Sequence, residues 1–117
     1  MLGHPSWGAL WEGLVVESCL ASLPNVQAFF YRTSNGAEVD LVLENAFKRV
    51  VVEAKASTSP TVGKGFWIAL DDLKPTSAFV CAPVSTAYPI GPQVWVVPIQ
   101  EMHQRLTKAF GSADKPV

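Results

Sequence analysis

Residues 38–55 have the sequence EVDLVLENAFKRVVVEAK, and the elements predicted for the rest of the chain are placed relative to this stretch. Apolar and acidic residues alternate over residues 38–44, which predicts a strand with one apolar face. The β-branched run over residues 49–55 predicts a second strand, central in its sheet. Only residues 45–48 separate the two, so we expect an antiparallel hairpin. Three apolar residues of the first strand are expected to share one face: Val39, Leu41 and Leu43.

The sequence on either side of this hairpin predicts three helices and three more strands. Upstream, Ser6 is a typical N-cap for a helix from Trp7 to about Leu23, and an aromatic strand covers residues 28–32. Downstream we expect a helix, two strands and a terminal amphipathic helix, at residues 64–73, 77–82, 94–97 and 99–110. Residues 83–92, rich in proline and glycine, are expected to form a loop. The order α-β-β-β-α-β-β-α predicts an α/β domain in which helices flank a mixed sheet.

Length and charge narrow the class of protein. With 117 residues, the chain has a common size for one domain, and we expect a single domain over residues 1–110 with a flexible tail at residues 111–117. Apolar residues make up 49% and charged residues 16%, a composition that excludes an intrinsically disordered chain. The net charge of −1, from 9 Lys and Arg against 10 Asp and Glu, excludes a strongly basic nucleic-acid binder but not a local basic groove.

The sequence also indicates a compartment. Cys19 and Cys81 have the spacing of neither a zinc site nor a disulfide framework, so we expect two buried thiols in a reducing environment. No signal peptide is visible, and no apolar run approaches the ~20 residues that span a bilayer. We therefore expect a cytoplasmic protein that makes no membrane contact.

A group of charged residues lies where the hairpin strands are expected to end. The period of two in a strand places Glu53 and Lys55 on one face of an otherwise apolar run, and buried charges are costly unless they are paired or bind a ligand. Asp40 lies 13 positions upstream of Glu53, so the hairpin can bring the two carboxylates together. Because carboxylates repel each other, we expect a positive charge between them, either Lys55 or a divalent cation.

Mg²⁺ or Mn²⁺ suits this set of oxygen donors. In this interpretation Asp40 and Glu53 bind the ion together with the Ala54 carbonyl, while Glu12, in an apolar sector of the first helix, contributes through water. Lys55 would orient the attacking water or stabilise charge on a phosphate, which is the chemistry of phosphodiester hydrolysis. The alternative is structural: Glu53 and Lys55 form an ion pair at a strand end, and Asp40 is a solvent-facing carboxylate.

Three sequence blocks carry a resemblance to a known family: residues 4–12 (HPSWGALWE), residues 31–40 (YRTSNGAEVD) and residues 52–55 (VEAK). Together they resemble the PD-(D/E)XK nuclease superfamily. That resemblance implies the restriction-endonuclease-like core, α-β-β-β-α-β, here with an extra C-terminal strand and helix. The blocks are also similar to the C-terminal domain, of unknown function, of a prokaryotic AAA-type ATPase family. The resemblance extends over about residues 4–100.

The resemblance implies a role for each matching residue. It implies Glu12 as the helix acid, Asp40 and Glu53 as metal ligands, and Lys55 as the catalytic lysine. It also points to three accessory positions, which lie in the second block or on the helix after the Glu-x-Lys strand: Arg32, Glu38 and Lys64. The sequence has no Gly-x-x-x-x-Gly-Lys-Ser/Thr phosphate loop, so the ATPase would be a partner or another part of a longer protein.

Two functions follow from these observations. The first is a Mg²⁺- or Mn²⁺-dependent nuclease or phosphodiesterase that acts on nucleic acid. The second is a non-catalytic module of the same fold that docks on an AAA-type ATPase or on a second copy of itself, as a homodimer. The few Lys and Arg residues favour the second function, because affinity for a phosphate backbone grows with the number of cationic contacts.

Overall fold

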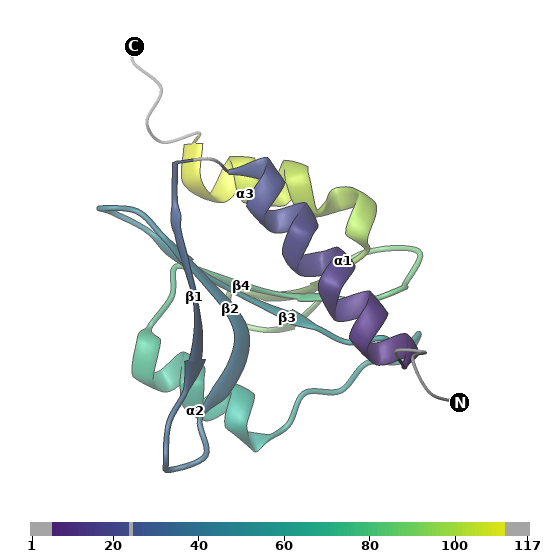
Figure 1. Cartoon of the computed structure of the whole chain (residues 1–117), viewed down its shortest axis with the longest axis horizontal. Coiled ribbons are helices and arrows are strands. Elements are labelled where there is room, and N and C mark those ends of the chain that lie inside the picture. The colour runs from purple at the N-terminus through teal and green to yellow at the C-terminus, as the bar shows by residue number, and fades with distance from the viewer. Residues whose placement is uncertain (1–5, 24, 112–117) are drawn as a thin grey trace.

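The computed structural model describes residues 6–23 and 25–111, and within them helices lie against a six-stranded sheet (Figure 1). In chain order the elements are α1 (Trp7–Ser22), β1 (Gln27–Arg32), β2 (Glu38–Glu44), β3 (Arg49–Ala54), α2 (Lys64–Leu73), β4 (Ser77–Cys81), β5 (Tyr88–Gly91), β6 (Val94–Val97), the 3₁₀ helix η1 (Ile99–Glu101) and α3 (Met102–Gly111). The predicted order of helices and strands is confirmed, with β5 and η1 added. The tail was expected at residues 111–117, but Gly111 is the last residue of α3, and residues 112–117 lie outside the described residues, as do His4 and Pro5 of the first motif block.

The sheet is mixed, as predicted, with the strand order β1-β2-β3-β4-β6-β5. β1, β2 and β3 form an antiparallel meander, and β3, β4 and β6 run parallel. β5 returns antiparallel along β6, so β1 and β5 are the two edge strands. α1 and α3 cover one face of the sheet and α2 covers the other, which places an apolar core on each side (Figure 1).

Buried side chains hold α1 on the sheet. Ser6 caps the helix as predicted, because its Oγ accepts a hydrogen bond of 3.1 Å from a backbone N–H of the first turn. Trp11, Val15 and Cys19 face the core, and Trp11 Nε1 donates to the Cys81 carbonyl at 2.9 Å. Both cysteines are buried free thiols, as predicted. Burial raises the pKa of each thiol to about 12, which keeps both in the unreactive protonated form.

The prediction that Val39 shares a face with Leu41 and Leu43 is wrong, because β2 contains a β-bulge. Between the pairs Phe29–Val42 and Tyr31–Val39, β1 advances two residues while β2 advances three. The extra residue falls at Asp40–Leu41, where it breaks the alternation of side chains. Val39 and Val42 therefore pack on the α2 side, whereas Leu41 and Leu43 pack on the side of α1 and α3.

The prediction that residues 83–92 form only a loop is also wrong, because they contain β5. Proline disfavours a strand since it has no N–H to donate. β5 lies at the edge of the sheet and pairs only with β6, with Pro89 opposite Trp95, so a missing donor can be tolerated there.

α1, with 16 residues, is the longest helix of the described chain. No helix within residues 6–23 and 25–111 has the length and apolar character needed to cross a bilayer.

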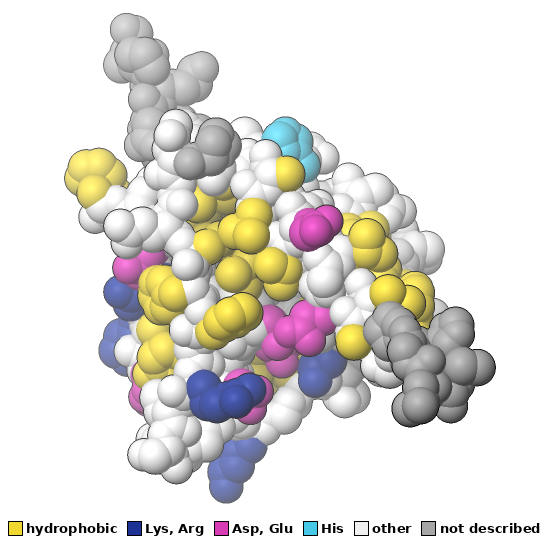
Figure 2. Space-filling view, in the orientation of Figure 1, with side chains coloured by type: hydrophobic (Ala, Val, Ile, Leu, Met, Phe, Trp, Pro, Cys, Tyr) yellow, Lys and Arg dark blue, Asp and Glu magenta, His cyan; other side chains and the backbone are white. Residues whose placement is uncertain are grey.

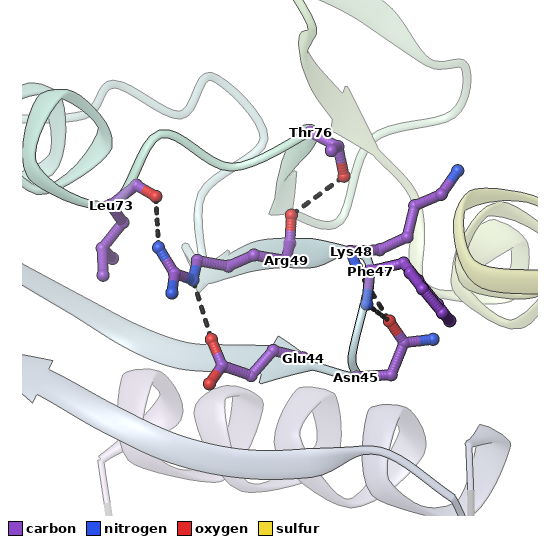
Figure 3. A network of polar contacts seen from close by, with 7 residues as sticks. All are labelled: Glu44, Asn45, Phe47, Lys48, Arg49, Leu73 and Thr76. Carbon is purple, nitrogen blue, oxygen red and sulfur yellow. Dashed lines mark hydrogen bonds and ion pairs between the residues drawn. The ribbon is translucent and has the colours of Figure 1, made fainter.

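Arg49 connects the turn end of the β2–β3 hairpin to the end of α2 (Figure 3). Its Nε lies 2.7 Å from Glu44 Oε2, and its Nη1 donates to the Leu73 carbonyl at 2.5 Å. Its own carbonyl accepts hydrogen bonds from the backbone N–H and the side-chain hydroxyl of Thr76. Arg49 thus connects β2, the end of α2 and the start of β4.

Replacing this arginine should lower stability measurably. We expect Arg49→Ala to reduce the free energy of unfolding by about 1–2 kcal/mol, because charged hydrogen bonds to Glu44 and to the end of α2 are lost from a half-buried site. Arg32→Ala is the matched control: its ion pair with Glu38 is exposed and should contribute under about 0.5 kcal/mol. Urea unfolding followed by tryptophan fluorescence measures both, and equal effects would contradict this role.

Candidate functional site

Asp40 and Glu53 meet where the regular pairing of β2 with β3 ends. The last regular pair is Leu41–Val52. One step further, the Asp40 backbone N–H donates to Glu53 Oε1 at 3.0 Å, and the Ala54 backbone N–H donates to Asp40 Oδ2 at 2.8 Å. Each carboxylate thus satisfies a backbone donor on the opposite strand. The expectation that the hairpin brings these two carboxylates together is confirmed.

Glu53 is ionised only at a considerable energetic cost. Its side chain is 13% exposed, and burial is the main reason that its pKa rises from 4.5 to about 7. The nearby charge of Asp40 raises the pKa further, while the Asp40 N–H and Lys55 act in the opposite direction. Near neutral pH this carboxyl group therefore exchanges a proton readily.

Lys55 is the cation nearest to Glu53 among the described ion pairs. Its Nζ lies 3.9 Å from Glu53 Oε2, and its side chain is 36% exposed. The predicted placement of these two side chains on one face of the strand is therefore confirmed. At this distance the contact is a loose ion pair, so the ammonium group remains able to contact a second anion.

A hollow of about 380 Å³ opens beside Asp40, between α1 and the β1–β2 pair. Seven residues line it: Glu12, Phe30, Tyr31, Arg32, Glu38, Val39 and Asp40. Figure 2 shows acidic side chains gathered near the middle of this face, with hydrophobic side chains around them. The helix acid predicted from the first motif block therefore does reach the same place as Asp40.

The pKa of Glu12 also reflects the acidic residues gathered around the hollow. The pKa of Glu12 is raised, first by the charge of Asp40, then by burial and by Glu38. An acid on α1 thus senses two acids on β2, which lies next to it in the hollow. The local field is negative, and a cation placed there would be stabilised.

The accessory residues divide into two groups. Arg32 and Glu38 face each other across β1 and β2, and Arg32 Nη2 lies 2.8 Å from Glu38 Oε2 at the mouth of the hollow. Lys64 begins α2 and is exposed, and none of the described contacts joins it to Asp40 or Glu53. The structure therefore brings Arg32 and Glu38 to the site and leaves Lys64 outside its lining.

The donor atoms suit a hard divalent cation. Mg²⁺ is usually held by one or two carboxylates together with waters and phosphate oxygens, and Asp40 and Glu53 supply two mutually repelling carboxylates. Across the described residues, no three side chains of His, Cys, Asp or Glu converge as a metal-binding group. Glu12 would accordingly take part through water, and the Ala54 carbonyl as a ligand stays a prediction.

Phe30 lines this hollow although its sequence context does not single it out. Phe30 lies in the edge strand β1 and lines the same hollow as Glu12 and Asp40. Its side chain is 74% exposed, although large apolar residues are usually covered. The pair Phe29–Phe30 is visible in the sequence, but exposure is not, so only the packing distinguishes this ring from a core aromatic.

Comparison with known proteins gives two curated relatives in mycobacteria. Uncharacterized protein Rv2008c of Mycobacterium tuberculosis (strain ATCC 25618 / H37Rv) and uncharacterized protein Mb2031c of Mycobacterium bovis (strain ATCC BAA-935 / AF2122/97) are each 29% identical to this chain over 99 residues. The matched region covers 85% of this chain but 22% of each relative. The chain therefore spans about a fifth of the length of the curated relatives that it matches.

A family comparison covers most of the chain. Residues 7–102 match the family described as domain of unknown function DUF4143. This range contains α1, the whole sheet and each residue of the candidate site. The chain belongs to the DUF4143 family.

Proposed function

We propose that this domain is a divalent-metal-dependent nuclease or phosphodiesterase of the PD-(D/E)XK type, with the restriction-endonuclease-like core that its α-β-β-β-α-β order suggests. The observation that carries the proposal is the convergence of Asp40 and Glu53 at the fork between β2 and β3, with Lys55 3.9 Å from Glu53. A structural ion pair at a strand end needs one carboxylate. The second carboxylate raises the pKa of the first, and a bound cation would offset that repulsion.

Each residue has a distinct task in this proposal. Asp40 and Glu53 hold Mg²⁺ or Mn²⁺, with the Ala54 carbonyl beside them and Glu12 acting through water. A cation bound there supplies a Lewis acid for a phosphate oxygen. Lys55 orients the attacking water or stabilises the charge that develops on the phosphate. Arg32 lies at the mouth of the hollow, where it can contact a neighbouring phosphate once it leaves Glu38.

Binding of Mn²⁺ tests the metal site. At about pH 8, calorimetric titration should show that Asp40→Asn weakens Mn²⁺ binding by at least about tenfold, because the variant keeps the size of the side chain but removes one anionic ligand. Asp71→Asn is the control, since Asp71 is exposed on α2 and pairs with Lys74 away from the hollow. Equal Mn²⁺ affinity in Asp40→Asn and the wild-type chain would exclude this site.

Cleavage tests the catalytic role separately. Labelled DNA incubated with Mn²⁺ should be cut by the wild-type chain, while Lys55→Ala should bind Mn²⁺ but lose cleavage, because Lys55 acts on the substrate rather than on the ion. A wild-type chain that binds Mn²⁺ and cuts no nucleic acid would contradict the nuclease.

A specific observation favours the second candidate, a docking module. Trp7, Leu10 and Leu14 are 49–55% exposed along one side of α1, and an apolar helix face normally packs against something. The curated relatives are also several times longer than this chain, so a further part of such a protein, an AAA-type ATPase or a second copy could cover this helix. Absence of Mn²⁺ binding, together with self-association that Leu14→Glu abolishes in sedimentation velocity, would favour this candidate.

A further inference from the structure

The exposed ring of Phe30 is placed beside the carboxylates of the candidate site. In the β1–β2 register, Phe30 falls between the pairs Phe29–Val42 and Tyr31–Val39, so it lies opposite the bulge at Asp40. Both residues line the same hollow, and Phe30 is 74% exposed there. A flat apolar surface is thus presented next to the point where the proposed function requires a phosphodiester group.

We infer that Phe30 is a stacking platform for an unpaired base, and that the substrate is single-stranded nucleic acid. This inference rests on the proposed function, because that function places the phosphate at Asp40 and the attached base within reach of β1. In a duplex, neighbouring bases cover the faces of each base, so an aromatic side chain can stack only on an unpaired or extruded base. A single strand leaves those faces free.

The charge of the chain points to the same substrate. Binding of a duplex depends mainly on many Lys and Arg contacts to phosphates, and this chain has 9 Lys and Arg against 10 acids. Among the residues that line the hollow, Arg32 alone is a cation, and it already pairs with Glu38. Stacking does not depend on net charge, so it can supply affinity where cationic contacts are few.

Binding of a short oligonucleotide tests the platform. The probe is a fluorescein-labelled single strand of about 12 nucleotides. Ca²⁺ replaces Mg²⁺, so that a cation occupies the carboxylate oxygens while the strand is not cleaved during the measurement. Fluorescence anisotropy should show that Phe30→Ala weakens binding about tenfold, while Phe30→Tyr keeps the affinity because it keeps the ring. The duplex of the same sequence should bind at least about tenfold more weakly than the single strand.

Phe47→Ala is the matched control. Phe47 is also an exposed phenylalanine, 82% exposed, but it lies in the β2–β3 turn and not in the lining of the hollow (Figure 3). Its variant should bind the oligonucleotide as the wild-type chain does. Circular dichroism should show both alanine variants folded, since each removes a ring that is mostly in solvent.

The outcomes separate this inference from the proposed function. Equal affinities for Phe30→Ala and Phe47→Ala, or a preference for the duplex, would overturn the stacking platform even where Asp40 binds Mn²⁺. A wild-type chain that binds no Mn²⁺ but binds the single strand through Phe30 would overturn the metal site and would leave the stacking platform supported. A wild-type chain that binds no single strand would overturn the inference. Contact with another protein would then be the explanation for the exposure of Phe30.

Discussion

At about pH 8, the Glu53→Gln variant should be more stable than the wild-type chain by about 3 kcal/mol in the free energy of unfolding. Glu53 is largely buried next to Asp40, and these surroundings raise its pKa from 4.5 to about 7. Glutamine keeps the size of the side chain and an oxygen that can accept the hydrogen bond from the Asp40 N–H, but it carries no charge. The substitution therefore removes an electrostatic penalty and keeps the packing.

The sign of the pH dependence follows from proton binding in the two states. The native state keeps the Glu53 proton up to about pH 7, whereas the unfolded chain releases it near 4.5, so stability falls as the pH rises through this window. Below about pH 4 both states are protonated and the variant should gain little. Urea unfolding at several pH values between about 4 and 8, followed by tryptophan fluorescence, measures this difference.

Glu17→Gln is the control for this prediction, because Glu17 is exposed on α1 and its replacement should change stability by under about 0.5 kcal/mol. A Glu53→Gln variant that is less stable than the wild-type chain at every pH would show that the ionised carboxylate holds β2 and β3 together. If Glu53→Gln is more stable but no longer binds Mn²⁺, the ionised Glu53 carboxylate destabilises the fold and is required for metal binding.

Gly65→Ala should destabilise the chain by about 2–3 kcal/mol. A Cβ at residue 65 would lie 2.5 Å from the Gly36 carbonyl oxygen, a backbone atom that cannot rotate away. Backbone hydrogen bonds hold the β1–β2 turn in place: the Thr33 N–H donates to the Ala37 carbonyl at 2.9 Å and the Gly36 N–H donates to the Thr33 carbonyl at 3.2 Å, which opposes a shift of the turn away from α2. The first turn of α2 approaches this turn so closely that only glycine fits at residue 65.

Gly13→Ala is the control of opposite sign. Gly13 lies inside α1 with nothing within 4 Å of an added Cβ, so alanine should stabilise the helix by about 0.5–1 kcal/mol. Thermal and urea unfolding of both variants measure the two effects. If Gly65→Ala is as stable as the wild-type chain, the close approach of α2 to Gly36 is not required for the fold.

Periodicity and capping residues determine much of this fold, and the sequence predicts that part well. β2 and β6 have the predicted bounds, as does α2, because alternation, a β-branched run and a Pro stop are local signals. β5 was not predicted, because proline makes it resemble a loop and only its place at the sheet edge allows it to pair. The bulge at Asp40 was not predicted either, because it depends on the partner strand β1.

In the candidate site too, local features are predictable from the sequence and features that depend on tertiary packing are not. The meeting of Asp40 with Glu53 was predictable, since the hairpin fixes the distance between them along the chain. The hydrogen bonds from Asp40 N–H and Ala54 N–H were not, because they arise where the ladder opens. Phe30 was missed because exposure results from tertiary packing, which a single sequence does not display.

The bulge in β2 makes the site depend on the number of residues as well as on their identity. In a regular strand, residue 40 would share a face with Val42, which packs toward α2, while Glu12 lies on α1 at the opposite side of the sheet. A chain shortened by one residue in β2 could keep every acid of the site and still separate them. In related chains, the count of residues between Asp40 and Glu53 is therefore as informative as the acids themselves about whether the site is assembled.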